Sequence, residues 1–370
     1  MKIFFKLIKL LFLAIFFISI PTIYYIRYLK NVVYYTGKPV EYFNGKEFAR
    51  ISYEEQPFLG NWQEEAEIRE KMRSIFFKRM LFGEEKQKPE DIVEVLKSKP
   101  NANSPTDIIR TYYINHSTFL IQASGLNIIT DPIYSNKAGP YNLVGTKRLH
   151  KPGIDLNDLP NIDIVIISHG HFDHLDLWTV KQIFKKNNPL FIVPAGVGYL
   201  IKSVHKNIRY IELLWNEETV FKNIKFTLTP AYHWYKRGLF DDNKALWGGF
   251  IIQTQNSNIY FSGDTAYGDG KVFKEIGEKY KTIDLALLPI GAYLPNSFMR
   301  RSHTNPLEAV KIFKLINAKK AIAMHTGTFT LSLDTISIAT KDLKEAKEEL
   351  TVEDFNVLKP GQYLDILDKK

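Results

Sequence analysis

Side chains that could bind metal are concentrated in one short segment, residues 168–176, which reads Ser-His-Gly-His-Phe-Asp-His-Leu-Asp. His169 and His171, two residues apart, can bind one cation through imidazole nitrogens, whereas Asp173 and His174 are offset enough to face a second. Imidazole with a carboxylate suits zinc or a similar borderline metal, and a hard ion such as calcium would not select it. The alternative, a polar loop with scattered histidines, leaves three histidines and two aspartates within eight residues unexplained. The segment therefore predicts a metal site.

Apolar runs of strand length precede this segment and the other candidate ligands. Residues 162–167 are short enough to form a buried strand, which places residues 168–176 in the loop at its end. Further along the chain, His233 follows residues 226–230, Asp264 follows residues 259–263 and His325 follows residues 321–324. A strand followed by a ligand, repeated in this way, predicts a sheet scaffold that presents all the ligands at one edge.

This order of ligands, His-x-His-x-Asp-His followed by His, Asp and His, resembles the metallo-β-lactamase superfamily. The resemblance implies an α/β fold in which two sheets form an αββα sandwich with helices on both outer faces. It also implies two zinc ions per chain. The first ion would be held by His169, His171 and His233, and the second by Asp173, His174 and His325, with Asp264 bridging the two.

Further motifs narrow the resemblance to one branch of that superfamily. They are TDPI at 130–133, GTKR at 145–148, HW at 233–234, DDNK at 241–244, LWG at 246–248, PIGAY at 289–293, HTNP at 303–306 and GTF at 327–329. Together they resemble the N-acylphosphatidylethanolamine-hydrolysing phospholipase D family, in the same order over residues 106–329. The resemblance implies cleavage of a phosphodiester in a membrane phospholipid.

The residues predicted to act in catalysis are Asp173, Asp264 and His303. Two zinc ions that share a water molecule can lower its pKa to roughly 7, which supplies a nucleophile at neutral pH. Asp173 and Asp264 would take part as ligands. His303 follows Arg300 and Arg301 and is not needed as a ligand, so we expect it to act on the phosphoryl group as an electrophile or proton donor. The alternative for His303 is an ordinary loop histidine.

Three other polar residues are expected to support the ligands rather than bind metal. His116 follows the apolar and aromatic residues 112–114 at a predicted strand end. Ser168 and Asp176 flank the first metal motif, and both are expected to orient ligands by hydrogen bonds.

Composition limits the classes of protein that the chain can belong to. Its 370 residues allow one large α/β domain with a short appendage. The absence of cysteine excludes disulfides, thiolate zinc sites and cysteine nucleophiles. The chain has a net charge of +9 but contains no recognised nucleic-acid-binding module, so nucleic acid is not an expected partner. The positive charge instead suits anionic lipid headgroups.

An uncharged apolar run, residues 10–26, lies near the N-terminus and is close to the lower limit of about 17 residues for crossing a bilayer. It is flanked by basic residues and by interfacial tyrosines, namely Lys2, Lys6, Lys9, Arg27, Lys30, Tyr24, Tyr25 and Tyr28. A cleaved signal peptide is the alternative, but no small-x-small cleavage site follows the run. The sequence therefore predicts an uncleaved single-pass transmembrane anchor over residues 1–30. The catalytic domain is expected on the exported side, periplasmic or extracellular, with the cytoplasmic face left open.

After the anchor, residues 31–105 are predicted to be a linker and a helical lead-in, with helices at 63–80 and 89–97. Residues 106–370 are predicted to form the hydrolase domain. The expected function is a membrane-anchored di-zinc phosphodiesterase that releases an N-acylethanolamine and phosphatidic acid. The alternatives are a hydrolase of another ester, a lactone or a sugar phosphate, and an inactive metal- or lipid-binding protein. The expected partners are a phospholipid substrate and the membrane, and a homodimer is left open.

Overall fold

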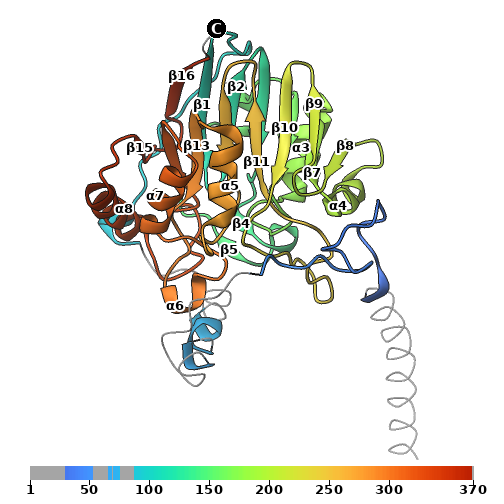
Figure 1. Cartoon of the computed structure of the whole chain (residues 1–370), viewed down its shortest axis with the longest axis horizontal. Helices are drawn as coiled ribbons and strands as arrows, with labels where there is room; N and C mark the ends of the chain where they lie inside the picture. The colour runs from blue at the N-terminus through green and yellow to red at the C-terminus, as the bar shows by residue number, and fades with distance from the viewer. Residues whose placement is uncertain (1–29, 53–65, 69, 76–86, 369–370) are drawn as a thin grey trace, which may run out of the picture.

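Two seven-stranded sheets form the centre of the computed structural model, which describes residues 30–52, 66–68, 70–75 and 87–368 (Figure 1). In order across the first sheet, the strands are β16 (Tyr363–Leu367), β1 (Ile108–Asn115), β2 (Thr118–Ala123), β3 (Leu126–Thr130), β6 (Ile164–Ile166), β7 (Leu190–Pro194) and β8 (Arg209–Leu213). Across the second sheet they are β15 (Phe355–Asn356), β14 (Ala321–Met324), β13 (Leu285–Pro289), β12 (Asn258–Phe261), β11 (Gly249–Gln253), β10 (Ile224–Thr229) and β9 (Glu218–Phe221). A separate pair is formed by β4 (Lys137–Ala138) and β5 (Thr146–Lys147).

Helices cover the outer face of each sheet. The described helices are α3 (Leu177–Asn187), α4 (Val197–Val204), α5 (Lys271–Tyr280), α6 (Asn296–Met299), α7 (Pro306–Leu315), α8 (Ile336–Leu350) and the short 3-10 helices η1 (Pro89–Asp91), η2 (Pro140–Asn142) and η3 (Leu156–Asp158). Val180 of α3 and Ile201 of α4 pack with the first sheet, whereas Phe273 of α5 and Phe313 of α7 pack with the second. The predicted αββα sandwich is confirmed.

The central strands of the second sheet are apolar at successive positions because both of their faces are buried. In β13, Leu285 and Leu287 belong to the core between the sheets, and Ala286 and Leu288 belong to the core beneath the helices. Successive side chains of a strand point to opposite faces, so an uninterrupted apolar run is what this position requires.

The strands that precede the candidate ligands end at the same edge. β3 and β6 are parallel neighbours in the first sheet, and β12, β13 and β14 are parallel neighbours in the second. β10 runs parallel to β12 because each of them pairs antiparallel with β11. The residues that follow these strands therefore leave from the same edge of their sheet, as the sequence predicted.

Part of the segment predicted to be a linker and a helical lead-in contributes to the core. Tyr35 and Phe48 are buried in the core of the sandwich. The predicted helix over residues 89–97 is wrong, since only η1 forms there. The backbone after η1 is extended instead, and the N–H groups of Leu96 and Ser98 donate to the distant carbonyls of Pro360 at 2.8 Å and Gly153 at 3.0 Å. The helix predicted over residues 63–80 lies largely outside the described residues, and 66–68 and 70–75 are helical.

No helix within the described ranges has the length and apolar character needed to cross a membrane. The predicted anchor, residues 1–30, lies outside those ranges except for its last residue, Lys30.

Candidate metal centre

Three histidines from two loops bring their ring nitrogens together. Nε2 of His169 lies 2.9 Å from Nδ1 of His171, and Nε2 of His233 lies 3.2 Å from the same Nδ1. His169 and His171 come from the loop after β6, and His233 comes from the loop after β10. His233 Nδ1 is placed to donate to the Ser302 carbonyl at 2.9 Å, which leaves its Nε2 available for a metal. The sequence assigned these three residues to the first metal.

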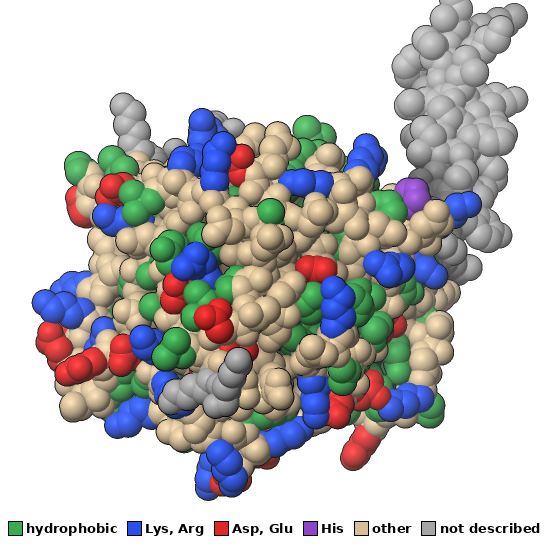
Figure 2. All heavy atoms as spheres, turned by 90° about the horizontal axis from the view of Figure 1, so that it is seen from above, with side chains coloured by type: hydrophobic (Ala, Val, Ile, Leu, Met, Phe, Trp, Pro, Cys, Tyr) green, Lys and Arg blue, Asp and Glu red, His purple; other side chains and the backbone are tan. Residues whose placement is uncertain are grey.

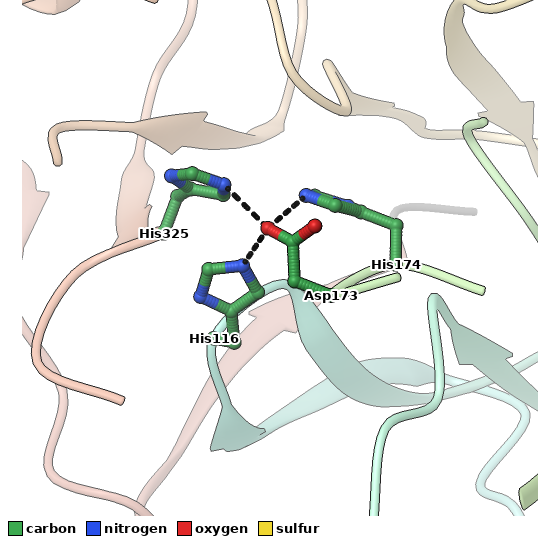
Figure 3. A group of neighbouring side chains, drawn as sticks. All are labelled: His116, Asp173, His174 and His325. Carbon is green, nitrogen blue, oxygen red and sulfur yellow. Dashed lines mark hydrogen bonds and ion pairs between the residues drawn. The ribbon is translucent and has the colours of Figure 1, made fainter. Parts of the chain in front are cut away.

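A second group surrounds the carboxylate of Asp173 (Figure 3). Its Oδ2 lies 2.9 Å from Nε2 of His116, 3.4 Å from Nε2 of His174 and 3.4 Å from Nε2 of His325. Asp173, His174 and His325 are the residues that the sequence assigned to the second metal. His116, expected to support ligands, contacts Asp173 directly and could also offer a nitrogen to the same ion.

Asp264 lies between the two groups. Its Oδ2 is 3.0 Å from Nε2 of His325, 3.3 Å from Nε2 of His174 and 3.8 Å from Nε2 of His233. The carboxylate of Asp264 therefore lies where a ligand shared by two metal ions would have to lie. The same oxygen lies 3.8 Å from Nδ1 of His303, so the sandwich places His303 beside the metal residues.

The donor atoms of these residues fit metal ions. Nε2 of His174, Nε2 of His325 and Oδ1 of Asp264 are buried and make no hydrogen bond within the described part of the chain. Buried polar atoms are rarely left unpaired, so such a cluster indicates a missing partner. Imidazole nitrogens with carboxylate oxygens form the ligand set that zinc and related metals prefer. These residues therefore fit a divalent metal.

Asp131 is a residue whose role the sequence did not reveal. Its carboxylate accepts hydrogen bonds from the Ser168 backbone N–H at 2.7 Å and from the Ser168 hydroxyl at 2.5 Å, and it lies 2.6 Å from His174 Nδ1. Asp131 therefore fixes which nitrogen of His174 faces the metal. Ser168 Oγ also lies 2.9 Å from His169 Nδ1, in agreement with the expected role of Ser168. The available signal was the TDPI motif at residues 130–133, which contains Asp131.

Asp176 does not orient a ligand, and this prediction is corrected. Its carboxylate accepts hydrogen bonds from the backbone N–H groups of Trp178, Tyr134 and Ser135 and from the Thr179 hydroxyl. It therefore caps the start of α3, as aspartates at this position commonly do. Asp176 thus fixes where the helix after the metal loop begins.

Two further residues hold the metal loop in place. Gly170 packs against the ring of Tyr235, and a Cβ at position 170 would lie 2.1 Å from Tyr235 Cε2, so any larger residue would force that ring to move. Nη1 of Arg237 donates to the carbonyls of Gly170 at 2.9 Å and Leu175 at 2.8 Å, and its guanidinium lies 4.0 Å from the centre of the Phe172 ring. The loop is thus tied to the segment that follows His233.

The charges of the metal-free centre are strongly coupled. Burial alone would lower the pKa of His325, but the carboxylates of Asp264 and Asp173 raise it to about 9. Burial would raise the pKa of both aspartates, but the neighbouring His174 holds both values well below the usual range. Burial lowers the pKa of His303 to about 4 and that of His116 to about 3.

Comparison with known proteins agrees with this geometry. The sequence model of the beta-lactamase superfamily domain matches residues 126–326. The chain is 35% identical over 270 residues to N-acyl-phosphatidylethanolamine-hydrolyzing phospholipase D 1 of Caenorhabditis elegans, which covers 70% of this chain and 76% of that protein. It is 37% identical over 216 residues to the mitochondrial N-acyl-phosphatidylethanolamine-hydrolyzing phospholipase D of Saccharomyces cerevisiae, covering 56% of this chain and 45% of that protein.

Solved structures support the fold alone. The metallo hydrolase Igni18 of Ignicoccus hospitalis matches with a TM-score of 0.52 and 22% identity, over 70% of this chain and 98% of that one. An isothiocyanate hydrolase from Delia radicum gut bacteria matches with a TM-score of 0.55 and 19% identity, over 70% and 99%. The chain is a hydrolase with the metallo-β-lactamase fold, and it belongs to the N-acylphosphatidylethanolamine-hydrolysing phospholipase D family.

Proposed function

We propose that this protein is a zinc-dependent phosphodiesterase that hydrolyses N-acylphosphatidylethanolamine to an N-acylethanolamine and phosphatidic acid. The observation that carries the proposal is the position of Asp264 between two groups of histidines, since two metal sites that share one carboxylate suit phosphodiester hydrolysis. The names of the two related phospholipases support the choice of lipid.

Two zinc ions per chain are part of this proposal. His169, His171 and His233 would hold the first ion, Asp173, His174 and His325 the second, and Asp264 both. When bound, the ions supply Lewis acids for phosphoryl oxygens and an activated water at neutral pH. The protein keeps these ligands in place through Asp131 behind His174 and the Ser302 carbonyl behind His233.

His303 is proposed to act on the substrate. Its side chain is 15% exposed, and its Nδ1 faces Asp264 at 3.8 Å without making a hydrogen bond within the described part of the chain. The next residues are fixed, because Thr304 Oγ1 donates to the Pro289 carbonyl and Asn305 forms the capping box that starts α7. An imidazole held there can donate a hydrogen bond to a phosphoryl oxygen or to the leaving oxygen.

Membrane attachment completes the proposal. The uncharged residues 10–26 would serve as a single-pass anchor, with the catalytic domain on the exported side of the membrane. A lipid-cleaving enzyme held in this way would meet its substrate without leaving the bilayer.

The proposed function is tested with full-length protein and defined lipid in water enriched in ¹⁸O. Attack of water on phosphorus should place one ¹⁸O in phosphatidic acid and none in the N-acylethanolamine, as read by mass spectrometry. Chelator should abolish the reaction and zinc should restore it. Label in the N-acylethanolamine, or full activity of metal-free protein, would contradict the proposal. Turnover of a lactone or a sugar phosphate alone would favour the hydrolase of another ester.

A further inference from the structure

A cavity of about 590 Å³ lies on the outer side of the metal loop. It is bounded by the start of α3, the end of α4 and η2, and Phe172 of the metal loop lines it. Its volume falls within the roughly 300–1,000 Å³ typical of small-molecule sites. None of the residues that line it belongs to the two metal groups. The cavity is therefore separate from the metal centre, although it touches the loop that carries the ligands.

The walls and rim of this cavity are rich in apolar and aromatic side chains. Phe172, Leu177 and Val204 line it, and Tyr141 and Trp178 stand at the rim, 93% and 48% exposed. Large apolar side chains that remain exposed around a cavity mark a binding surface. Tyrosine and tryptophan are also the residues that proteins place at the boundary between lipid and water.

The charged groups of the cavity are mainly basic. Lys137, Lys181 and Arg237 line it; Lys137 Nζ donates to the Leu143 carbonyl at 2.8 Å and Arg237 donates to the carbonyls of the metal loop, so the contacts of these two cations are to neutral backbone oxygens. The single acid in the lining is Asp176, whose oxygens accept hydrogen bonds from the start of α3 and from the backbone of Tyr134 and Ser135. By contrast, the face seen in Figure 2 mixes basic and acidic side chains. Cations beside apolar walls suit an anionic amphiphile.

The N-terminal segment leaves the sandwich on the same side as the cavity. The ring of Tyr34 stacks on that of Tyr199 in α4, with centres 4.4 Å apart, and the last turn of α4 lines the cavity. Nζ of Lys244 donates to the carbonyls of Lys30 at 3.0 Å and Val32 at 2.7 Å. Figure 1 shows this segment beside α4. The chain is therefore held next to the cavity where the predicted anchor ends.

We propose that this cavity binds one anionic phospholipid of the membrane that carries the protein. Its phosphate would lie among Lys137, Lys181 and Arg237, and the first part of an acyl chain would pack on Phe172 and Trp178. The site goes beyond the proposed function because it is a second lipid site, at which the lipid is bound but not hydrolysed. Arg237 also holds the metal loop through the Gly170 and Leu175 carbonyls, so the bound lipid would contact that loop from outside.

Binding can be measured on the full chain in neutral detergent with chelator present, so that no lipid is hydrolysed. The probe is a short-chain phosphatidylglycerol with brominated acyl chains, which quench tryptophan fluorescence on contact. We expect saturable quenching in the wild type, most of which is lost in Trp178→Phe. Lys181→Glu should weaken apparent affinity by roughly fivefold or more, the worth of one basic residue near a lipid surface. Lys185→Glu, one turn further along α3 and outside the cavity lining, should bind like the wild type.

Two comparisons identify the ligand class. The matching brominated phosphatidylcholine should bind more weakly than phosphatidylglycerol, and millimolar inorganic phosphate should not displace the lipid. Complete displacement by phosphate would make this a free-phosphate site and overturn the proposal. Equal quenching of the wild type and Trp178→Phe, or equal affinity of Lys181→Glu and the wild type, would also overturn it. Because chelator is present throughout, these outcomes do not depend on the proposed reaction.

Discussion

Several residues at the metal centre have a positive φ angle, a backbone conformation that residues other than glycine seldom adopt. The φ angles of Asp131, His116 and His325 are +33°, +47° and +62°. Such conformations cost free energy and persist only where the surroundings enforce them. The backbone N–H of His325 donates to the His116 carbonyl at 3.0 Å, which ties two of these residues together. The fold thus fixes the direction of each side chain before any metal binds.

Replacing His303 should separate substrate handling from metal binding. His303→Ala should retain both metals, because His303 is not needed as a ligand, and should lower turnover by roughly 10²–10⁴-fold. The loss should be smaller for an activated ester whose leaving group needs no proton. His205→Ala is the matched control, since His205 packs on Phe184 far along α3 from the metal loop. Metal analysis with kinetics tests this: loss of a metal would make His303 a ligand, and unchanged turnover would make it an ordinary loop histidine.

Replacing Asp131 should weaken the second metal selectively. Asp131→Asn removes the charge that orients His174 but keeps the shape, so affinity for one of the two metals should fall roughly 10–100-fold. Titration with a competing chelator measures both affinities. Asp163→Asn, at the residue directly before β6, serves as the control. Equal weakening of both metals would argue against a specific effect on His174.

At the scale of elements, the centre depends on how loops at strand ends pack against one another. The loop after β6 carries four of the metal residues and is packed between Tyr235 and Arg237 from the loop after β10. Its far end is fixed by the Asp176 cap of α3. The first metal group therefore needs both loops in register, since His233 comes from one and His169 from the other.

Gly170→Ala should disturb this packing. The added methyl would overlap the Tyr235 ring, and overpacking of this kind typically costs about 1–3 kcal/mol of stability. We expect a lower melting temperature and weaker metal binding. A double-mutant cycle with Tyr235→Ala tests the cause, because the double variant should lose less than the sum of the two single variants. Strict additivity would show that the two residues do not interact as described.

At the scale of the whole molecule, the N-terminal segment is part of the folded domain. Lys244 is 1% exposed and donates to two carbonyls of residues 30–32, while Phe48 is 1% exposed in the core. The predicted boundary at residue 106 stays a prediction, but residues 30–52 contribute to the same core as the sheets.

Two truncations should therefore differ sharply. A variant without residues 1–29 should fold, bind metal and cleave detergent-dispersed lipid. A variant without residues 1–52 should be much less stable. Removing the buried Phe48 ring alone should lower the free energy of unfolding by about 3–5 kcal/mol, as a Phe→Ala substitution in a core does. Lys244 would also lose both carbonyl acceptors. Thermal melts and metal content test both variants, and equal stability would show that the segment only rests on the surface.

The stability of the metal-free protein should depend on pH in a defined direction. The folded-state pKa of His325 is raised from the usual 6.5 to about 9, so its protonation stabilises the folded chain fully below pH 6.5. That contribution is lost as pH rises through 9. The free energy of unfolding of chelated protein should therefore fall across this window. Zinc-loaded protein should not show the fall, because metal displaces the proton.

His325→Asn is the control for this pH dependence. The substituted amide does not titrate, so the fall in unfolding free energy between pH 6.5 and 9 should shrink in the metal-free variant. Chemical denaturation at a series of pH values gives the comparison. A rise in stability over this window in the chelated wild type would contradict the assignment of charges.

The sequence by itself predicted the candidate metal residues and their place at one edge of the fold, and the structure brings these residues together. The ligands follow apolar strands directly, and both the strand pattern and the ligand spacing are local features of the chain. Only the tertiary structure decided the contacts between distant segments. Asp131 reaches His174 across 43 residues because β3 and β6 pair side by side.

The roles of Asp176, Arg237 and the segment of residues 30–52 also depend on the tertiary structure. Asp176 could have turned toward the ligands or toward α3, and the backbone N–H groups at the start of α3 and at 134–135 decide between them. Residues 92–97 likewise form no helix, and the backbone N–H groups of Leu96 and Ser98 donate to the distant carbonyls of Pro360 and Gly153. A short polar side chain can form hydrogen bonds with nearby backbone groups in several different conformations. Which one it adopts depends on the partner that the fold brings to it, and that partner lies far away in the sequence.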